Sequence, residues 1–284
     1  MPDSSQTDHL AALGYVDPRE LEERKATAAQ RLHAVREAAV AAWKLGDIAS
    51  AQDLISSLLP TEDDASEPAV FESDAASRRL AGAFFVAIQR WRDAQHCLDW
   101  LEHRGFESLP LTVWRVRTAV ALRQWCEATD QAEYAVGLGA SPGLLAIVEG
   151  ERKRRTGDLD EAALLFQAAV AGGQWKALAY AGLTALALQR GQWDDAVDMA
   201  LDALENDICD AATHARLGIA LCRQGRIAEA ESALAAATHF GPRCVAAWAW
   251  RARLAHLQGK LEPSEQYRAT ARELVRARRC DAAT

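Results

Sequence analysis

Apolar residues recur every three or four positions along most of the chain, in stretches of about a dozen residues separated by short polar turns. This spacing places apolar side chains on one face of an α-helix, whereas a strand would alternate them from face to face. The stretches come in pairs, and a small or glycine residue often stands where the first member of a pair ends. The pattern predicts antiparallel helical hairpins and no β-sheet.

The pairs repeat with a period of 34 residues, which is set by Gly157, Gly191, Gly225 and Gly259. A small residue follows each glycine by five positions, and an alanine follows each of them by twelve. Upstream, Gln89 and Arg123 occupy the glycine position of the same frame. One further unit fits around Gly46 after an insertion of nine residues. We therefore predict seven units, starting near residues 32, 75, 109, 143, 177, 211 and 245.

Each column of the repeat has a physical reason. Glycine ends the first helix, because it adopts the left-handed cap conformation at little cost. Small residues at the eighth and twentieth positions let the two helices approach closely. Large residues at position seventeen, among them Trp91, Trp125 and Trp193, are expected to fill the core between units. One hairpin cannot bury its apolar face alone, so the units must stack.

The columns resemble the tetratricopeptide repeat family. Unit 211–244 carries the closest match, in the residues Leu217, Gly218, Leu221, Gly225, Ala230, Leu234, Ala237 and Pro242. Other units supply the aromatic signature positions as Trp248 and Phe166. The resemblance implies an all-α, right-handed α-solenoid of about seven antiparallel helix-turn-helix repeats over residues 32–278. It also implies a non-catalytic scaffold or adaptor for protein–protein interaction.

Segments outside the repeats are predicted to cap or connect them. Residues 1–31 form an acidic leader and an N-terminal capping helix that begins at Asp17–Pro18 and could also run into the first repeat. An acidic loop is inserted at 60–74, and residues 279–284 form a tail. The polar helix from Pro263 to Arg279 is expected to cover the last hairpin.

Charge and composition limit the classes of function that the sequence favours. The net charge is −8, of which residues 1–74 contribute −9 and the rest +1, so no segment has the basic excess that would favour nucleic acid. No stretch of eighteen apolar residues and no secretory pattern occurs, and we expect a cytoplasmic protein that does not enter membranes. The high content of alanine and arginine suggests a bacterial source.

Catalytic and metal-binding motifs are absent from the sequence. No phosphate-binding glycine loop, zinc-protease motif or nucleophile elbow is present, and we expect no enzymatic activity and no cofactor. Six cysteines include no Cys-x-x-Cys pair, and Cys209, His214 and Cys222 lack a fourth ligand for a metal. Small buried thiols are the simpler interpretation.

The first helix of each unit should present positions two, five, nine and twelve or thirteen to the concave surface, with position six at its border. These positions are rich in arginine, tryptophan and aliphatic residues. The predicted partner-binding residues are Arg79, Trp114, Arg117, Arg154, Arg155, Arg216, Arg223, Trp250 and Arg253. We expect a protein or peptide partner in this groove, and an acidic one would suit the arginines, which bind carboxylates in a planar fork.

The sequence leaves open several alternatives for the role of these arginines and of the protein. Arginine could merely solvate the helix faces, because the chain has 27 Arg and five Lys. The family also includes chaperones of bacterial secretion substrates, and regulatory or accessory subunits of enzyme complexes. A nucleic-acid or small-effector binder is a further alternative. The carboxylate clamp of heat-shock co-chaperones needs two asparagines, whereas this chain has only Asn206.

Overall fold

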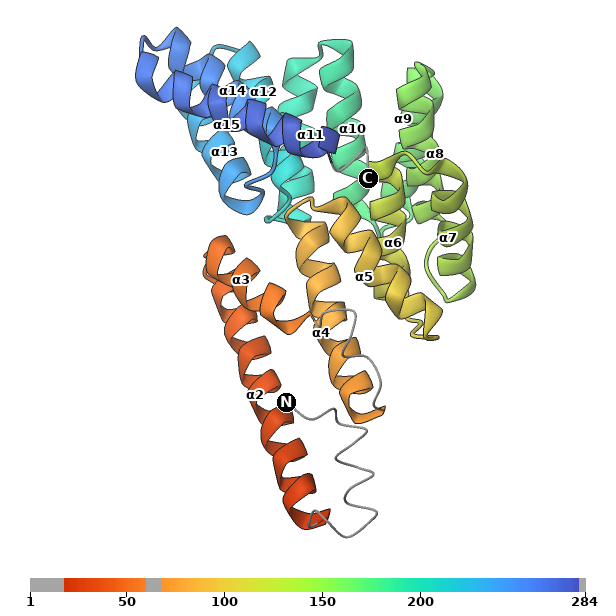
Figure 1. The fold of residues 1–284 in the computed structure, drawn as a ribbon. Coiled ribbons are helices and arrows are strands. Elements are labelled where there is room, and N and C mark those ends of the chain that lie inside the picture. The colour runs from red at the N-terminus through yellow and green to blue at the C-terminus, as the bar shows by residue number, and fades with distance from the viewer. Residues whose placement is uncertain (1–17, 60–67, 281–284) are drawn as a thin grey trace. The chain divides into compact units, whose positions relative to one another are not determined.

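The computed structural model describes residues 18–59 and 68–280. That part of the chain forms fourteen α-helices and no β-strand, which confirms the all-α prediction. Within each unit, most helices pair with the next one as antiparallel hairpins joined by short turns (Figure 1). The chain divides into two units, one of residues 1–83 and 97–105 and the other of residues 84–96 and 106–284.

The first unit contains α2 (Pro18–Lys44), α3 (Ile48–Leu58), most of α4 (Pro68–Ala87) and the end of α5 (Trp91–His103). Helices α2 and α3 form a hairpin whose turn passes through Gly46 at φ 78°. The Asp47 carboxylate then caps α3 by accepting a hydrogen bond from the Ser50 amide at 3.1 Å. These local signals place the first turn of the chain where the repeat frame had it.

The structure decides one open alternative about this unit and corrects the bounds of the predicted loop. Helix α2 runs without a break from Pro18 to Lys44, so the predicted capping helix and the first helix of the first repeat are one element. Helix α4 begins at Pro68, so the last seven residues of the predicted loop at 60–74 are helical. Pro68 suits the first turn of a helix, since its missing amide hydrogen is not needed there. The leader 1–17 and residues 60–67 lie outside the described part.

The second unit contains five complete hairpins. Their first helices begin at or within one residue of the starts that the frame predicts. The helices are α6 (Leu109–Leu122), α7 (Trp125–Gly137), α8 (Gly143–Thr156), α9 (Leu159–Ala171), α10 (Lys176–Arg190), α11 (Trp193–Asn206), α12 (Ala211–Arg223), α13 (Ile227–Phe240), α14 (Val245–Leu257) and α15 (Leu261–Cys280). Each of α8, α10, α12 and α14 packs on both helices of the hairpin before it.

The turn residues confirm the glycine column. Gly157, Gly191, Gly225 and Gly259 all have positive φ, between 75° and 99°. Gln89 and Arg123 occupy the same position and are the two non-glycine residues with positive φ in the described chain, both at 63°. Because L-residues are strained in this region, the turn geometry of the repeat overrides the preference of these two side chains. The hairpins, turns and spacing are those of a tetratricopeptide-type array, which confirms the resemblance at the level of the fold.

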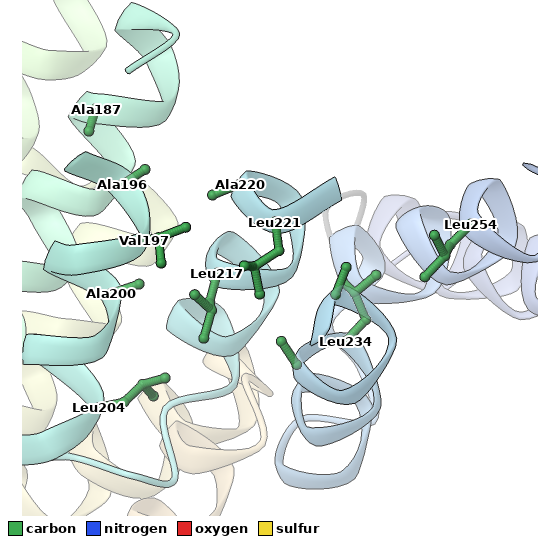
Figure 2. Close-up of a cluster of buried hydrophobic side chains, with 12 residues drawn as sticks. Ala187, Ala196, Val197, Ala200, Leu204, Leu217, Ala220, Leu221, Leu234 and Leu254 are labelled. Carbon is green, nitrogen blue, oxygen red and sulfur yellow. The ribbon is translucent and has the colours of Figure 1, made fainter. Parts of the chain in front are cut away.

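Small residues let the helices approach where the frame predicts. A Cβ added to Gly218 would lie 2.6 Å from Cγ of Leu234, and one added to Gly182 would lie 2.4 Å from Cε1 of Phe166. Alanines and leucines then form a continuous core through α10 to α14 (Figure 2). These distances are too short for a real Cβ, so the helices can pack this closely only where one of them has no side chain. This is why the small-residue columns recur.

Tryptophans and cysteines are less buried than the sequence suggested. Trp91, Trp125, Trp193 and Trp248 are half-buried instead of enclosed, because the large indole of each lies partly at the surface of the stack. Cys97 and Cys244 are buried, as expected, whereas Cys126 and Cys209 are exposed.

Helix α15 differs from the separate covering helix predicted for Pro263–Arg279. It is the second helix of the last hairpin and packs against α14. It extends to Cys280, so the first two residues of the predicted tail are helical.

Candidate functional site

The second unit holds a cavity of about 450 Å³, which we call the central groove. Its walls come from the first helices of consecutive hairpins, α6, α8, α10 and α12, together with the end of α4 and the start of α5. Half-buried aliphatic side chains contribute to the surface, among them Val120, Ile147 and Leu178. Arg117, Arg155 and Arg216 bring guanidinium groups to it.

The central groove follows the predicted concave stripe. Positions two and five of successive units appear as Leu144 and Ile147 on α8, and position two again as Leu178 on α10. Position nine supplies Arg117 on α6 and Glu151 on α8. The floor is formed by Phe166 of α9, which is fully buried and fits between Gly150 and Gly182. Helical periodicity therefore places these residues together, and the glycines let the aromatic floor approach.

Glu151 is the main counter-charge inside the groove. Its carboxylate accepts hydrogen bonds from Arg154 at 2.7 Å and from Arg155 at 2.8 Å, and its side chain is 13% exposed. Burial alone would raise the pKa of Glu151, but the hydrogen bonds and charges of Arg154 and Arg155 outweigh it and hold the pKa below its usual value. Two of the predicted binding arginines are thus already paired with a carboxylate.

Arg117 and Arg216 are differently placed. Within the described residues, Arg117 forms no ion pair or hydrogen bond. Arg216 donates one hydrogen bond of 3.3 Å to the carbonyl oxygen of Ala181. The nearby acid Asp210 caps α12 by accepting from the amide of Thr213 at 3.1 Å. These two guanidinium groups therefore have capacity to bind a carboxylate, which offers bidentate acceptors to arginine.

Three other predicted residues form a stacked set beside α12 and α14. The guanidinium carbons of Arg223 and Arg253 lie 5.4 Å and 4.9 Å from the centre of the Trp250 ring. Arg223 also lies 5.4 Å from the ring of Trp193. An equivalent contact joins Arg155 to Trp125 at 5.7 Å, two repeats earlier. These contacts use the ring faces in cation–π interactions, so the arginines order the tryptophans.

Trp114 and Arg79 belong neither to the central groove nor to the stacked set. Trp114 is half-buried on α6, and its carbonyl accepts a hydrogen bond from Thr118. Arg79 is exposed on the part of α4 that belongs to the first unit. The structure therefore brings together Arg117, Arg155 and Arg216, with Arg154 attached through Glu151.

Some residues of the groove escaped sequence analysis. Three residues contribute to its wall around the turn between α4 and α5: Val86 near the end of α4, Gln89 in the turn and Trp91 at the start of α5. They occupy positions twelve, fifteen and seventeen of their unit. Position twelve belongs to the predicted concave stripe, so the valine there could have been predicted from the helical period. The contribution of a turn residue such as Gln89 depends on how the hairpins stack, which the repeat frame does not specify.

A metal site, a reactive thiol and a membrane-spanning helix each place their own requirements on the described residues. They contain no cluster of His, Cys, Asp and Glu that could hold a metal ion. His214, one member of the sequence set considered for metal, stacks on Phe240 with 5.4 Å between ring centres. Burial and the neighbouring Asp207 raise the pKa of the Cys209 thiol, which opposes formation of a reactive thiolate. None of the helices in residues 18–59 and 68–280 is long and apolar enough to cross a membrane.

Comparison with known proteins gives structural likeness only. No family model matches the chain, and neither does any curated protein sequence. Two MamA structures are similar over 60% and 57% of this chain and 97% and 95% of theirs, at 20% and 15% identity and TM-scores of 0.42 and 0.44. YrrB, described as a TPR protein with an unusual peptide-binding site, is similar over 62% of this chain and 91% of its own, at 17% identity and a TM-score of 0.41. The assignment of the repeats rests on this chain's own columns and hairpins.

Proposed function

We propose that the chain is a non-catalytic interaction scaffold that holds an acidic, partly apolar peptide segment of a partner protein in the central groove. The observation that carries this proposal is the pair Arg117 and Arg216 beside an aliphatic wall. Neither guanidinium has a carboxylate partner among the described residues.

The chemistry of the wall favours a peptide over a small polar effector. Val120, Ile147 and Leu178 offer apolar surface that an aliphatic or aromatic side chain would cover. Arginine supplies orientation through paired hydrogen bonds to carboxylates. A segment that alternates acidic and apolar side chains satisfies both features. An adaptor and a chaperone of a secretion substrate would both use this same binding activity.

The test uses fluorescence anisotropy with a labelled synthetic peptide of alternating Glu and Leu, and a matched peptide of alternating Lys and Leu. Each carboxylate contact with a partly exposed arginine is worth on the order of 1 kcal/mol, and reversal adds repulsion. We therefore expect Arg117→Glu with Arg216→Glu to weaken binding of the Glu peptide by at least about tenfold, with an unchanged melting temperature.

Arg92→Glu is the matched control, since Arg92 is exposed on α5 and does not line the groove. It should leave affinity close to that of the wild type. Equal affinity of the double variant and the wild type, with both folded, would overturn the proposal. Tighter binding of the Lys peptide would do the same.

A further inference from the structure

The last hairpin of the second unit has two dissimilar sides. On one side Arg251 donates hydrogen bonds to Thr238 of α13 at 2.7 Å and to the hydroxyl of Tyr267 at 3.0 Å. Trp248 packs against Tyr267 with 5.6 Å between ring centres. These contacts fix α14 and α15 to each other and to the preceding helix.

The opposite side is an open groove of about 560 Å³ that is lined by α14 and α15 alone, which we call the terminal groove. Its floor is apolar and built largely of small residues at helical spacing. They are Val245, Ala249 and Ala252 on α14, and Ala271 and Val275 on α15. Val275 is 38% exposed, although it lies on this apolar floor.

The earlier hairpins show what shape such a groove accepts. In each of them, a first helix of the next hairpin packs on both helices: α8 on α6 and α7, α10 on α8 and α9, α12 on α10 and α11, and α14 on α12 and α13. The terminal groove repeats this two-helix surface, and small residues such as Ala249 and Ala271 allow close approach. An α-helix therefore fits its shape.

The rim of the terminal groove specifies the charge of that helix. Arg253, Arg268, Arg272 and Arg276 line it, with His256, and none of the described lining residues is acidic. Among the described residues, Arg268, Arg272 and Arg276 form no ion pair. Arg268, Arg272 and Val275 share one face of α15, since they are spaced by three or four residues. A row of unneutralised guanidinium groups beside an apolar floor suits Glu or Asp flanking an apolar stripe.

We propose that an acidic amphipathic helix of a partner protein docks in the terminal groove, with its apolar stripe on α14 and α15 and its carboxylates on Arg268, Arg272 and Arg276. This site is separate from the central groove and takes a helix, whereas the central groove takes a peptide segment that alternates in polarity. A nucleic acid would use the arginines but leave the apolar floor exposed, so the floor favours the helix.

The test is a titration of the full chain with a labelled synthetic peptide of about 15 residues, roughly four helical turns. The peptide has Leu at positions i, i+3, i+4 and i+7 of each repeat and Glu beside them. A scrambled peptide of the same composition removes the stripe but keeps the charge. We expect the patterned peptide to bind more tightly than the scrambled one and to become helical by circular dichroism.

Two variants probe the groove itself. The triple change R268E, R272E and R276E should weaken binding by at least about thirtyfold, because three partly exposed charge contacts are lost and reversed. Ala249→Leu keeps all charges and fills the floor, so it should also weaken binding. Melting temperatures establish that both variants fold. The central-groove variant with R117E and R216E should bind the helix as the wild type does.

Four results would overturn the proposal. They are equal binding of the scrambled peptide, wild-type affinity in both terminal-groove variants, loss of binding in the central-groove variant alone, and displacement of the peptide by a generic oligonucleotide. Sedimentation of the chain without peptide adds a fifth. A self-dimer that the triple variant abolishes would assign the groove to a second copy.

Discussion

The central and terminal grooves of the second unit are both lined by arginine and aliphatic residues, yet they treat charge in opposite ways. The central groove contains Glu151, which pairs with Arg154 and Arg155, and Asp210, which caps a helix. The terminal groove has four arginines, a histidine and no acid in its lining. Similar sequence composition therefore gives one partly neutralised surface and one whose described lining contains no counter-charge.

This difference has a consequence for binding. Charges that are already paired inside a protein contribute little to a ligand, because the ligand must compete with an existing partner. The central groove should thus select for the shape and apolar side chains of its peptide, assisted by Arg117 and Arg216. The terminal groove should bind with a steeper dependence on salt, since its guanidinium groups are exposed and unpaired.

Gly182→Ala should have the largest effect, and it should disrupt the central groove alone. The new methyl group would lie 2.4 Å from Phe166, which is fully buried and forms the groove floor. We expect a loss of about 1–3 kcal/mol in the free energy of unfolding, measured with urea.

Gly137→Ala provides the control, because nothing lies within 4 Å of a Cβ at that position in α7. Alanine is also the better helix former, so this variant should keep or slightly gain stability. If both variants were equally stable, Phe166 would not be tightly held, and the central groove would lack a rigid floor.

Glu151→Gln should remove the negative charge that neutralises Arg154 and Arg155, so that the central groove resembles the terminal one. We expect a loss of about 1–2 kcal/mol at neutral pH, because hydrogen bonds to charged groups in a largely buried site are broken. The freed Arg154 and Arg155 should bind the acidic peptide more tightly. Anisotropy and urea denaturation measure the two effects.

The pH dependence of this loss follows from the lowered pKa of Glu151. The stabilisation by the carboxylate is fully present above its ordinary pKa of 4.5 and is lost as the pH falls through the lower value in the folded protein. The difference between wild type and Glu151→Gln should therefore shrink in acid. Glu149→Gln, which breaks a more exposed pair with Arg152 on the same helix, should lose much less. A loss as large there would contradict the special role of Glu151.

Arg123→Gly should have the smallest effect and the opposite sign. Arg123 lies on the rim of the central groove at φ 63°, where the last hairpin has Gly259 at φ 75°. Relief of strain, less the greater freedom of glycine in the unfolded chain, should stabilise the protein by about 0.5–1 kcal/mol. The reverse change, Gly259→Arg, should destabilise it similarly by thermal denaturation. A loss of stability in Arg123→Gly would mean that the Arg123 side chain makes a compensating contact.

The sequence determined the hairpins because their signals are local. Helical periodicity, the glycine column and the small-residue columns fix where each helix ends and where two helices cross, and even Gln89 and Arg123 obey the frame with unfavourable φ. The concave stripe followed from the same period, and three residues predicted on it, Arg117, Arg155 and Arg216, line the central groove.

Only the tertiary structure decided which of these arginines are available. The pairing of Glu151 with Arg154 and Arg155, the stacking of Arg223 and Arg253 on Trp250, and the open side of α14 and α15 all depend on side-chain directions and on how hairpins stack. A repeat frame gives each position the same average surroundings, whereas the ends of the array and the neighbours of each charge differ from one hairpin to the next. Spacing along the chain can therefore specify a fold of this kind, but the binding capacity of its surface is set by contacts between residues about one repeat apart or more.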